Sequence, residues 1–436
     1  MGSYVPSSSK EREEMLRQIG VRSIDDLYAA VPRKMLVKSL DLPSGKSELE
    51  VSAIMTAKSE KNKIYKTILR GAGAYDHYIP AVVGSVVNKE QFVTAYTPYQ
   101  AEISQGILQN IFEYQTMICE LTGMDVSNAS VYDGATAMAE SVAMCKERKK
   151  VKAYISAAVN PQYLEVVKTY CSASDTELFV IPEKNGKTDA SALKKALCDD
   201  AACFIVQQPN FYGLFEDADK LGEITHAAGA KYVMCVNPIS MGVCKTPAEY
   251  GADVAVGEGQ PLGMPLAFGG PYLGFMACRE AMQRRLPGRI VGETVDVDGK
   301  RGYVLTLQAR EQHIRREKAS SNICSNQALC ALTAAVYLSA MGSKGLGEAA
   351  TLSASKAHYL QKELCKIEGV DLVFKGNFFN EFVTTLPRQD QVLRALDKAG
   401  ILGGLPIDQG VLWCATEKQS REELDRAVAI VKEVLA

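Results

Sequence analysis

The sequence predicts an α/β protein built on a mostly parallel sheet that helices cover on both faces. From Val151 onward, short apolar segments alternate with amphipathic ones, which is the order strand, helix, strand. The apolar segments are apolar at nearly every position, as strands are when both faces are buried. The 436 residues, 47% hydrophobic and 23% charged, are sufficient for a large core and two or three domains.

Residues 1–70 predict a helical arm that docks on another surface. Ser9 can cap a first helix that ends at Gly20, and Ser23 can cap a second that ends before Pro32. A third amphipathic stretch follows a Pro-Ser-Gly turn. We expect this arm to precede a large α/β domain, residues 71–335, and a small C-terminal α/β domain, residues 336–436.

Two loops between Gly71 and Gln105 are dense in tyrosine, glycine and proline. Their hydroxyls and ring faces could lie on an aromatic cofactor or donate to a phosphate. Tyrosine-rich loops are equally typical of subunit interfaces, so the residue types leave both interpretations open. The residues concerned are Tyr75 and His77 in the first loop, and Tyr96, Thr97, Tyr99 and Gln100 in the second.

A long helix is expected from Ile103 to Leu121, and a second helix begins at Asp133-Gly134-Ala135-Thr136 and ends in the basic cluster Lys146–Lys150. The backbone N–H groups at the start of the second helix could bind a phosphate. The alternative is a capped helix whose basic end complements its dipole, and these residues favour it.

The parallel sheet is expected to contain strands in the segments VKAYISAAV, TELFVIP, ACFIVQQP and KYVMCVN, with helices in PQYLEVVKTYC, DASALKKALCDD and DADKLGEITHAAG. Ligands of such sheets bind at the carboxyl ends of strands. That rule points to the loops 207–213 and 237–240.

The stretch from Asp253 to Gly274 holds six glycines and three prolines, as suits a loop wrapped around a cofactor. A pyridoxal enzyme would carry its Schiff-base lysine in such a place. The sequence has no lysine between Lys245 and Lys300. The chain therefore has the loop of a cofactor site without the amine that would anchor the cofactor.

A basic run that includes Arg315 precedes a small-residue stretch, 319–326, and a long apolar helix. The last hundred residues alternate helices (EAATLSASKAHYLQKELCKI, QVLRALDKAG, REELDRAVAIVKEVLA) with strands (VDLVFKG, EFVTTLP, GVLWCAT).

Composition excludes several classes of protein. A net charge of −2 gives no field that favours nucleic acid or an anionic membrane. The N-terminus lacks a signal-peptide core, and we expect no bilayer-spanning stretch. The 12 cysteines form no C-x-x-C pair and the four histidines lie apart from them, so we expect no metal site and a reducing, cytoplasmic location.

Five segments together resemble one family. GAGAYDHYIPAVV, TAYTPYQAEISQG, FIVQQPNFYG, PLAFGGPYLGFMACRE and REQHIRREKASSNICSNQAL are similar to the glycine decarboxylase P-protein of the glycine cleavage system. The chain resembles in particular subunit 1, the N-terminal half of the form that is split into two polypeptides. The likeness covers nearly the whole chain.

This resemblance implies pyridoxal-phosphate fold type I, with a large domain around a mostly parallel sheet and a small C-terminal α/β domain. It also implies a reaction in which glycine is decarboxylated on pyridoxal phosphate and the aminomethyl group passes to the lipoyl arm of the H-protein. In the catalytic half of the family, a lysine in a His-Lys-Thr tripeptide binds the cofactor, and an aspartate pairs with the pyridine nitrogen. Here Pro261 stands at the lysine position and Met234 at the acid position.

The resemblance therefore implies a subunit that is inactive alone and that completes the site of a lysine-bearing subunit 2, as an α2β2 assembly. The side chains expected to reach that site are Tyr96, Thr97, Tyr99, Gln100, Tyr75, His77 and Arg315, with no catalytic residue on this chain alone. One alternative is an autonomous pyridoxal enzyme that uses Lys231, Lys245 or Lys318. The other is a scaffold or regulatory subunit that takes no part in catalysis.

Overall fold

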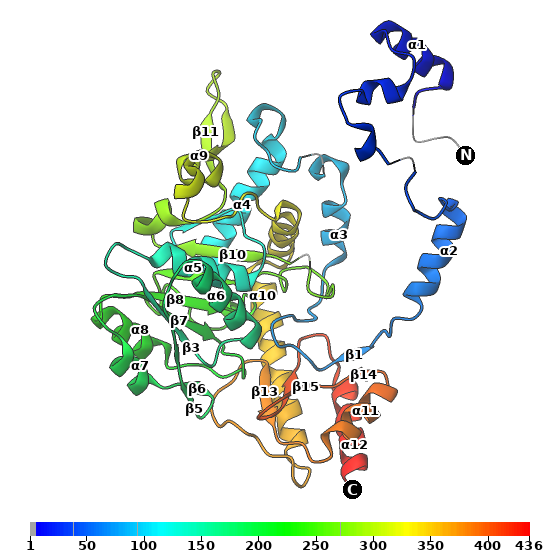
Figure 1. The fold of residues 1–436 in the computed structure, drawn as a ribbon. Helices are drawn as coiled ribbons and strands as arrows, with labels where there is room; N and C mark the ends of the chain where they lie inside the picture. The colour runs from blue at the N-terminus through cyan, green and yellow to red at the C-terminus, as the bar shows by residue number, and fades with distance from the viewer. Residues whose placement is uncertain (1–5, 38, 94, 271) are drawn as a thin grey trace. The chain divides into compact units, whose positions relative to one another are not determined.

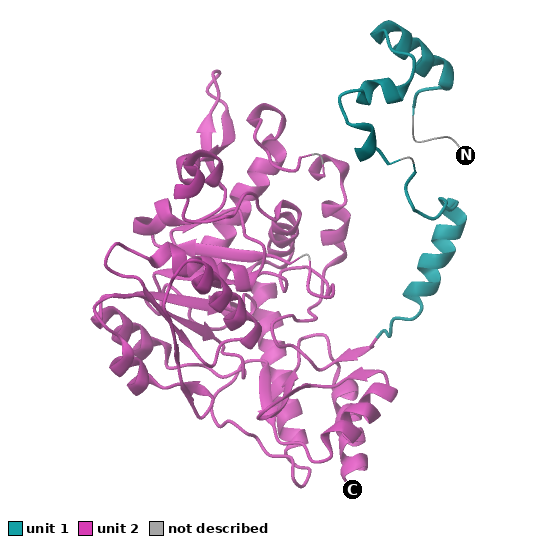
Figure 2. Ribbon diagram, viewed as in Figure 1, with its two compact units in different colours: residues 1–64 teal, residues 65–436 magenta. Residues whose placement is uncertain are grey.

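A computed structural model describes residues 6–37, 39–93, 95–270 and 272–436. Pro271 of the glycine-rich stretch thus lies outside the described residues. The contacts divide the chain into two compact units, Met1–Ile64 and Tyr65–Ala436 (Figure 2). Unit 1 contains α1 (Ser9–Ile19), α2 (Glu48–Ser59) and two 3-10 turns, η1 (Ile24–Tyr28) and η2 (Arg33–Met35).

The helix caps of unit 1 follow its sequence closely. Ser8, one residue before the expected Ser9, caps α1, and Gly20 ends the helix with a left-handed backbone, φ 83°. Ser23 caps the second element as predicted, but the chain forms only a 3-10 turn there instead of the expected α-helix. Ser47 caps α2 in a capping box with Glu50.

Unit 2 is organised around a seven-stranded sheet, which confirms the predicted α/β class (Figure 1). Five strands are parallel in the order β9 (Val254–Glu258), β8 (Lys231–Val236), β7 (Ala201–Gln208), β3 (Lys152–Ser156) and β4 (Leu178–Ile181). β10 (Gly274–Cys278) runs antiparallel to β9 and carries the short edge strand β2 (Val126–Ser127).

Helices cover both faces of this sheet because alternate side chains of its strands are apolar in both directions. On one face, Ile155, Ile205 and Val256 pack against α5 (Gly134–Cys145) and α6 (Pro161–Ala173). On the other face, strand residues such as Phe204 and Met234 pack against a second set of helices. That set comprises α4 (Gln105–Thr122), α7 (Ala190–Ala196), α8 (Ala218–Ala227) and the first half of α10 (Ala328–Leu364).

Helix α10 is long and apolar enough, by length and composition, to cross a membrane, which the sequence analysis did not anticipate. Gly342 interrupts it with a non-helical backbone, φ 61° and ψ −179°. Ala331 before this break lies in the core under the sheet, and Leu360 after it lies in a separate apolar cluster around Trp413. Packing on both sides of a break is what a core helix shows.

The C-terminal part of unit 2 is a small sheet with its own core around Trp413. The sheet pairs β13 (Glu381–Thr384), β16 (Gly410–Cys414) and β15 (Leu405–Ile407), and α11 (Gln389–Lys398) and α12 (Arg421–Leu435) accompany it. The prediction of a strand in residues 370–376 is wrong, since only an isolated bridge forms there, between Leu372 and Thr384. At the start of unit 2, β1 (Thr67–Ile68) pairs in parallel with β14 (Ile401–Leu402).

The remaining elements are short, apart from one hairpin. β11 (Ile290–Val295) and β12 (Arg301–Thr306) form this hairpin, which the sequence analysis did not predict. The others are α3 (Ala81–Val87), α9 (Gln312–Arg315), β5 (Glu183–Lys184), β6 (Lys187–Thr188), η3 (Glu90–Phe92), η4 (Ala101–Ile103), η5 (Ser240–Gly242), η6 (Glu280–Arg285), η7 (Gln308–Arg310) and η8 (Arg316–Lys318). The proposed division of residues 71–436 at 335/336 falls within α10 and stays a prediction.

Candidate functional site

A small pocket lies at the carboxyl ends of the parallel strands, where the sheet topology predicts a ligand site. Its volume is about 30 Å³, the share of one water molecule rather than of a cofactor. The described residues that line it are Gly73, Tyr75, Asn160, Tyr163, Gln207, Cys235, Val236, Asn237, Pro238 and Glu258. We call it the strand-end pocket.

Glu258, the last residue of β9, lines this pocket, and its carboxylate is bonded by backbone N–H groups. Its Oε2 accepts a hydrogen bond from the backbone N–H of Gly134 at the start of α5, at 2.9 Å. Its Oε1 accepts from the N–H groups of Gln260 and Leu273, both at 2.9 Å. Burial raises the pKa of the Glu258 carboxyl to about 7, although these three backbone donors lower it.

The start of α5 packs directly on this carboxylate. A Cβ at Gly134 would lie 2.8 Å from the Tyr163 hydroxyl and 2.9 Å from Cβ of Glu258, so only glycine fits. Asp133 caps the helix by accepting from Thr136 N at 2.7 Å, which confirms the predicted helix start. The helix ends at Cys145, before the basic cluster that was expected inside it.

Tyr75 closes the pocket from the other side and is bonded within the chain. Its hydroxyl donates to Oε2 of Glu381 at 2.7 Å, and its backbone N–H donates to Oε1 of Gln260 at 2.8 Å. Gln260 is fully buried and returns a hydrogen bond to the carbonyl of Tyr75 at 3.0 Å. Burial raises the pKa of Glu381 to about 7. The glycine-rich stretch and the first tyrosine loop are therefore locked to each other.

His77 is likewise buried, with its Nδ1 2.7 Å from Oε2 of Glu417. Burial raises the pKa of Glu417, but the hydrogen bond and the charge of His77 outweigh it and leave the pKa below its usual value. Glu417 also accepts from the backbone N–H of Tyr78 at 2.6 Å. Tyr75 and His77 thus face carboxylates of their own chain, and their predicted contact with a partner's cofactor stays a prediction.

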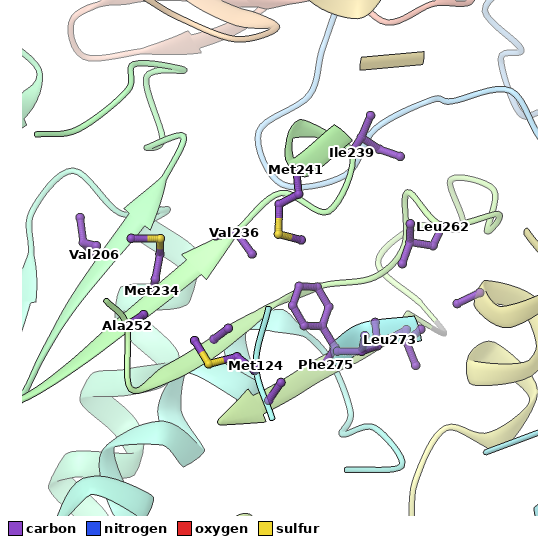
Figure 3. Close-up of a cluster of buried hydrophobic side chains, with 14 of the residues drawn as sticks. Met124, Val206, Met234, Val236, Ile239, Met241, Ala252, Leu262, Leu273 and Phe275 are labelled. Atoms are coloured by element: carbon purple, nitrogen blue, oxygen red, sulfur yellow. The ribbon is translucent and has the colours of Figure 1, made fainter. Parts of the chain in front are cut away.

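The side chains around the strand-end pocket do not fit pyridoxal phosphate. Pro261 is buried beside Gln260, and neither carries an amine. Met234 lies in the apolar cluster under the sheet, with Val206 and Phe275 (Figure 3), and does not line the pocket. The match of Met234 to the acid position stays a prediction; β8 presents Cys235 and Val236 to the pocket, followed by Asn237, and none of these three is an acid.

Among the described residues, no lysine lines this pocket. Lys231 begins β8, at the opposite end of the strand, and its Nζ lies 3.3 Å from Asp253. Lys245 lies 3.1 Å from Asp219, and Lys318 is exposed on η8. In the part of the chain that the structure describes, no group of three His, Cys, Asp or Glu side chains could hold a metal ion.

The second tyrosine loop, residues 96–100, has the opposite character. Tyr96 is 88% exposed and Tyr99 57%, yet the ring of Tyr99 lies over a buried cation. The Arg289 guanidinium sits 5.1 Å from the centre of that ring, and its Nη2 donates to the Tyr99 hydroxyl at 2.5 Å. Arg289 is paired in turn with Glu311, and both side chains are 2% exposed. We call residues 96–100 the outer loop.

The same neighbourhood includes three further residues. The hydroxyl of Thr97 lies 3.1 Å from that of Ser325, in the small-residue stretch. His313 packs edge-on against Tyr99 at 6.4 Å. Arg315 is exposed and donates from its Nε to the carbonyl of Ala309 at 3.3 Å. The loops that follow Ala95, Pro287 and Gln308 therefore meet at one surface.

The structure thus separates the seven predicted residues into two groups. The outer loop places Tyr96, Thr97, Tyr99 and Gln100 at the surface, Arg315 is exposed on α9, whose His313 contacts Tyr99, and Tyr75 and His77 point inward. Sequence analysis missed Glu258, Arg289 and Glu311. Glu258 was visible as the one acid inside the glycine-rich stretch after Asp253, but nothing in the sequence marks Arg289 and Glu311 as a pair.

Comparisons with known proteins agree with this geometry. Residues 2–431 match the model of the glycine cleavage system P-protein family. The chain is 50% identical to the "probable glycine dehydrogenase (decarboxylating) subunit 1" of Moorella thermoacetica over 444 aligned residues, which cover 100% of both chains. It is 48% identical to the protein of that name from Desulfitobacterium hafniense, over 99% of this chain and 100% of the relative.

Solved structures give the same result. The chain superposes on a crystal structure of glycine decarboxylase (P-protein) of the glycine cleavage system, in inhibitor-bound form, with a TM-score of 0.94 and 42% identity over 99% of this chain and 100% of that one. A sphingosine-1-phosphate lyase from Burkholderia pseudomallei, 14% identical, shares the fold alone with a TM-score of 0.67 over 94% of each chain. The fold is pyridoxal-phosphate fold type I. The chain belongs to the glycine cleavage system P-protein family.

Proposed function

We propose that this chain is the subunit of glycine dehydrogenase (decarboxylating) that carries no cofactor lysine and that completes the site of a second P-protein subunit. The assembled enzyme decarboxylates glycine and transfers the aminomethyl group to the lipoyl arm of the H-protein. The relatives' names support the first part, since a protein called subunit 1 of this enzyme has a second subunit. An α2β2 stoichiometry of the two subunits and a cytoplasmic location are part of the same proposal.

One contrast carries the proposal. The strand-end pocket has room for about one water molecule and, among its described lining residues, no amine. The outer loop, by contrast, holds two exposed tyrosines, and the ring of one of them, Tyr99, lies over a buried ion pair. An exposed aromatic surface is suited to contact another chain's site, whereas a pocket of this size without an amine is not suited to hold the cofactor itself.

Pyridoxal phosphate, held covalently by the partner subunit, supplies the electron sink for decarboxylation. In this proposal the present chain supplies only binding and exclusion of water. Tyr96 and Tyr99 cover the cofactor or substrate, Thr97 and Gln100 donate or accept hydrogen bonds there, and Arg315 attracts a phosphate or carboxylate. Tyr75 and His77 act from inside by fixing the loop 71–78 to Gln260 and Glu417.

The test replaces Tyr99 with phenylalanine in the assembled two-subunit enzyme. Tyr99→Phe keeps the ring over Arg289 but removes the hydroxyl that Nη2 of Arg289 bonds. We expect the complex to form normally and the glycine–bicarbonate exchange rate to fall by about tenfold to a hundredfold, as misplaced site groups commonly cause. Size-exclusion chromatography measures assembly, and labelled bicarbonate measures exchange.

Tyr359→Phe is the matched control. Tyr359 likewise lies over an arginine, with Arg421 5.2 Å from its ring, and likewise loses a hydroxyl contact, to Asp425, but it lies on α10 far along the chain from the outer loop. Its exchange rate should equal the wild-type rate. If Tyr99→Phe leaves exchange unchanged while the complex persists, a scaffold role replaces a shared site.

A further inference from the structure

The carboxylate of Glu258 has the surroundings of a bound anion. It accepts from three backbone N–H groups that belong to three different segments: Gly134 at the start of α5, Gln260 after β9, and Leu273 before β10. The side chain belongs to a residue only 8% exposed, and no described lysine or arginine lines the pocket with it. Backbone donors converging at a helix start form a cradle for anionic groups.

The location of this cradle is that of a cofactor phosphate. It lies at the carboxyl ends of β8 and β9, beside the start of α5, where ligands of a parallel sheet bind. Gly134 allows close approach to the helix start, and Glu258 makes that approach, since a Cβ added at Gly134 would lie 2.9 Å from Cβ of Glu258. The side chain of Glu258 therefore fills the space that a phosphate ester would need, and it accepts the hydrogen bonds that the ester would accept.

We propose that Glu258 is a built-in substitute for a cofactor's phosphate, and that it keeps the strand-end pocket of this chain closed to pyridoxal phosphate and other phosphate esters. The pocket is then closed in two independent ways, by the absence of an amine and by the Glu258 side chain, which occupies the three backbone donors. Loss of the lysine alone would leave a site able to hold the cofactor without a covalent bond. With Glu258 in the cradle, cofactor binds only at the partner's site.

The test is rescue by inorganic phosphate. Glu258→Ala leaves the three N–H groups without an acceptor and opens space in the cradle. We expect the midpoint of thermal unfolding of the full-length variant to fall, and phosphate at about a hundredfold excess over its Kd to raise it again by about 3 °C. Chloride at the same ionic strength should not raise it. The wild-type midpoint should not respond to phosphate.

Two variants serve as controls. Glu381→Ala removes a carboxylate that is as deeply buried and that has its pKa at about 7, but that accepts from Ala72 and the Tyr75 hydroxyl instead of a helix start. Glu258→Gln keeps the volume of the side chain and removes the charge. Neither variant should be stabilised by phosphate. The cavity left by Glu381→Ala is not at a helix start, and in Glu258→Gln the glutamine side chain still fills the cradle.

Two results would overturn the proposal. One is a Glu258→Ala midpoint that phosphate shifts no more than it shifts that of Glu381→Ala. The other, which does not depend on any variant folding, is saturable one-to-one binding of inorganic phosphate to the wild-type chain by calorimetry, competed by pyridoxal phosphate. Neither readout uses the partner subunit or turnover, so failure here is distinct from failure of the proposed function.

Discussion

The strand-end pocket and the outer loop stand in opposite relations to a ligand. In the pocket, the Glu258 carboxylate is bonded by three backbone donors, and the nearby Gln260 is bonded to the backbone of Tyr75 and Met264. In the outer loop, the supporting ion pair is buried and the tyrosine side chains are exposed. Tyr96 is 88% exposed, whereas Arg289 and Glu311 beneath Tyr99 are 2% exposed.

This difference separates what the chain has lost from what it retains. A fold type I chain with its own cofactor needs an open cradle and an amine at the strand ends. In this chain Glu258 fills the cradle, and Pro261 stands at the position expected for the lysine. A buried arginine–glutamate pair is costly to desolvate, and in this chain Arg289 of that pair contacts both the ring and the hydroxyl of Tyr99.

The largest effect is expected from breaking that pair. Arg289→Ala leaves the Glu311 carboxylate buried without its cation, which typically reduces the free energy of unfolding by about 3–5 kcal/mol. Denaturant unfolding of the purified chain measures it. Arg301→Ala is the control, since Arg301 lies 3.9 Å from Glu293 with both side chains exposed, and its loss should be below about 1 kcal/mol. Equal losses in the two variants would mean that the outer loop has no rigid support.

A smaller effect should appear in the pH dependence of stability. The folded-state pKa of Glu258 is raised to about 7, so its favourable contribution is complete below its usual pKa and is lost as the pH rises through about 7. Relative to Glu258→Gln, the wild type should therefore lose up to about 3 kcal/mol of unfolding free energy as the pH rises from about 4.5 to about 8. Parallel urea titrations at several pH values measure this difference.

Glu417 provides a test of the pH dependence because its pKa is shifted in the opposite direction from that of Glu258. Its pKa is lowered, so its contribution is present above its usual value and is lost as the pH falls below about 4.5. The advantage of the wild type over Glu417→Gln should thus shrink only at acid pH. Profiles that change in the same direction for both variants would contradict the assignment of these two carboxyls.

The smallest effect is local to the outer loop. Thr97→Val removes the hydroxyl contact with Ser325, which is worth about 1 kcal/mol. Backbone amides of residues 95–97, 99 and 100 should then exchange with deuterium roughly fivefold faster, as about 1 kcal/mol of local opening implies. Thr351→Val, which removes a helix-surface bond to Gly347, should leave these amides unchanged. Unchanged exchange in both variants would mean that Ser325 does not hold the loop.

Much of the fold was predictable because its sheet is buried on both faces. Continuous apolar segments such as Ala202–Val206 have few alternatives to a central strand, and β7 forms there. The strand expected in 370–376 failed because apolar and polar residues mix in it, and only Leu372 finds a ladder partner. The hairpin of β11 and β12 was missed although Asp298-Gly299 gives the usual turn signal.

The candidate site was less predictable because it depends on contacts between distant segments. The sequence does not distinguish a loop tyrosine whose hydroxyl donates to a buried carboxylate, as Tyr75 does to Glu381, from one that is exposed to solvent, as Tyr96 is. Arg289 and Glu311 lie 22 positions apart and belong to no motif. The sequence likewise does not show which side chains of β8 face the pocket, where Cys235 and Val236 lie and Met234 does not.

Reductive trapping of the assembled enzyme tests the central claim most directly. Borohydride treatment of the two-subunit complex, followed by peptide mapping, fixes the cofactor to whichever lysine holds it. We expect the pyridoxyl label only on a peptide of the partner subunit, and no visible absorption band of a lysine-bound cofactor from this chain purified alone. A pyridoxyl-lysine in any peptide of this chain, Lys231, Lys245 and Lys318 included, would contradict the account.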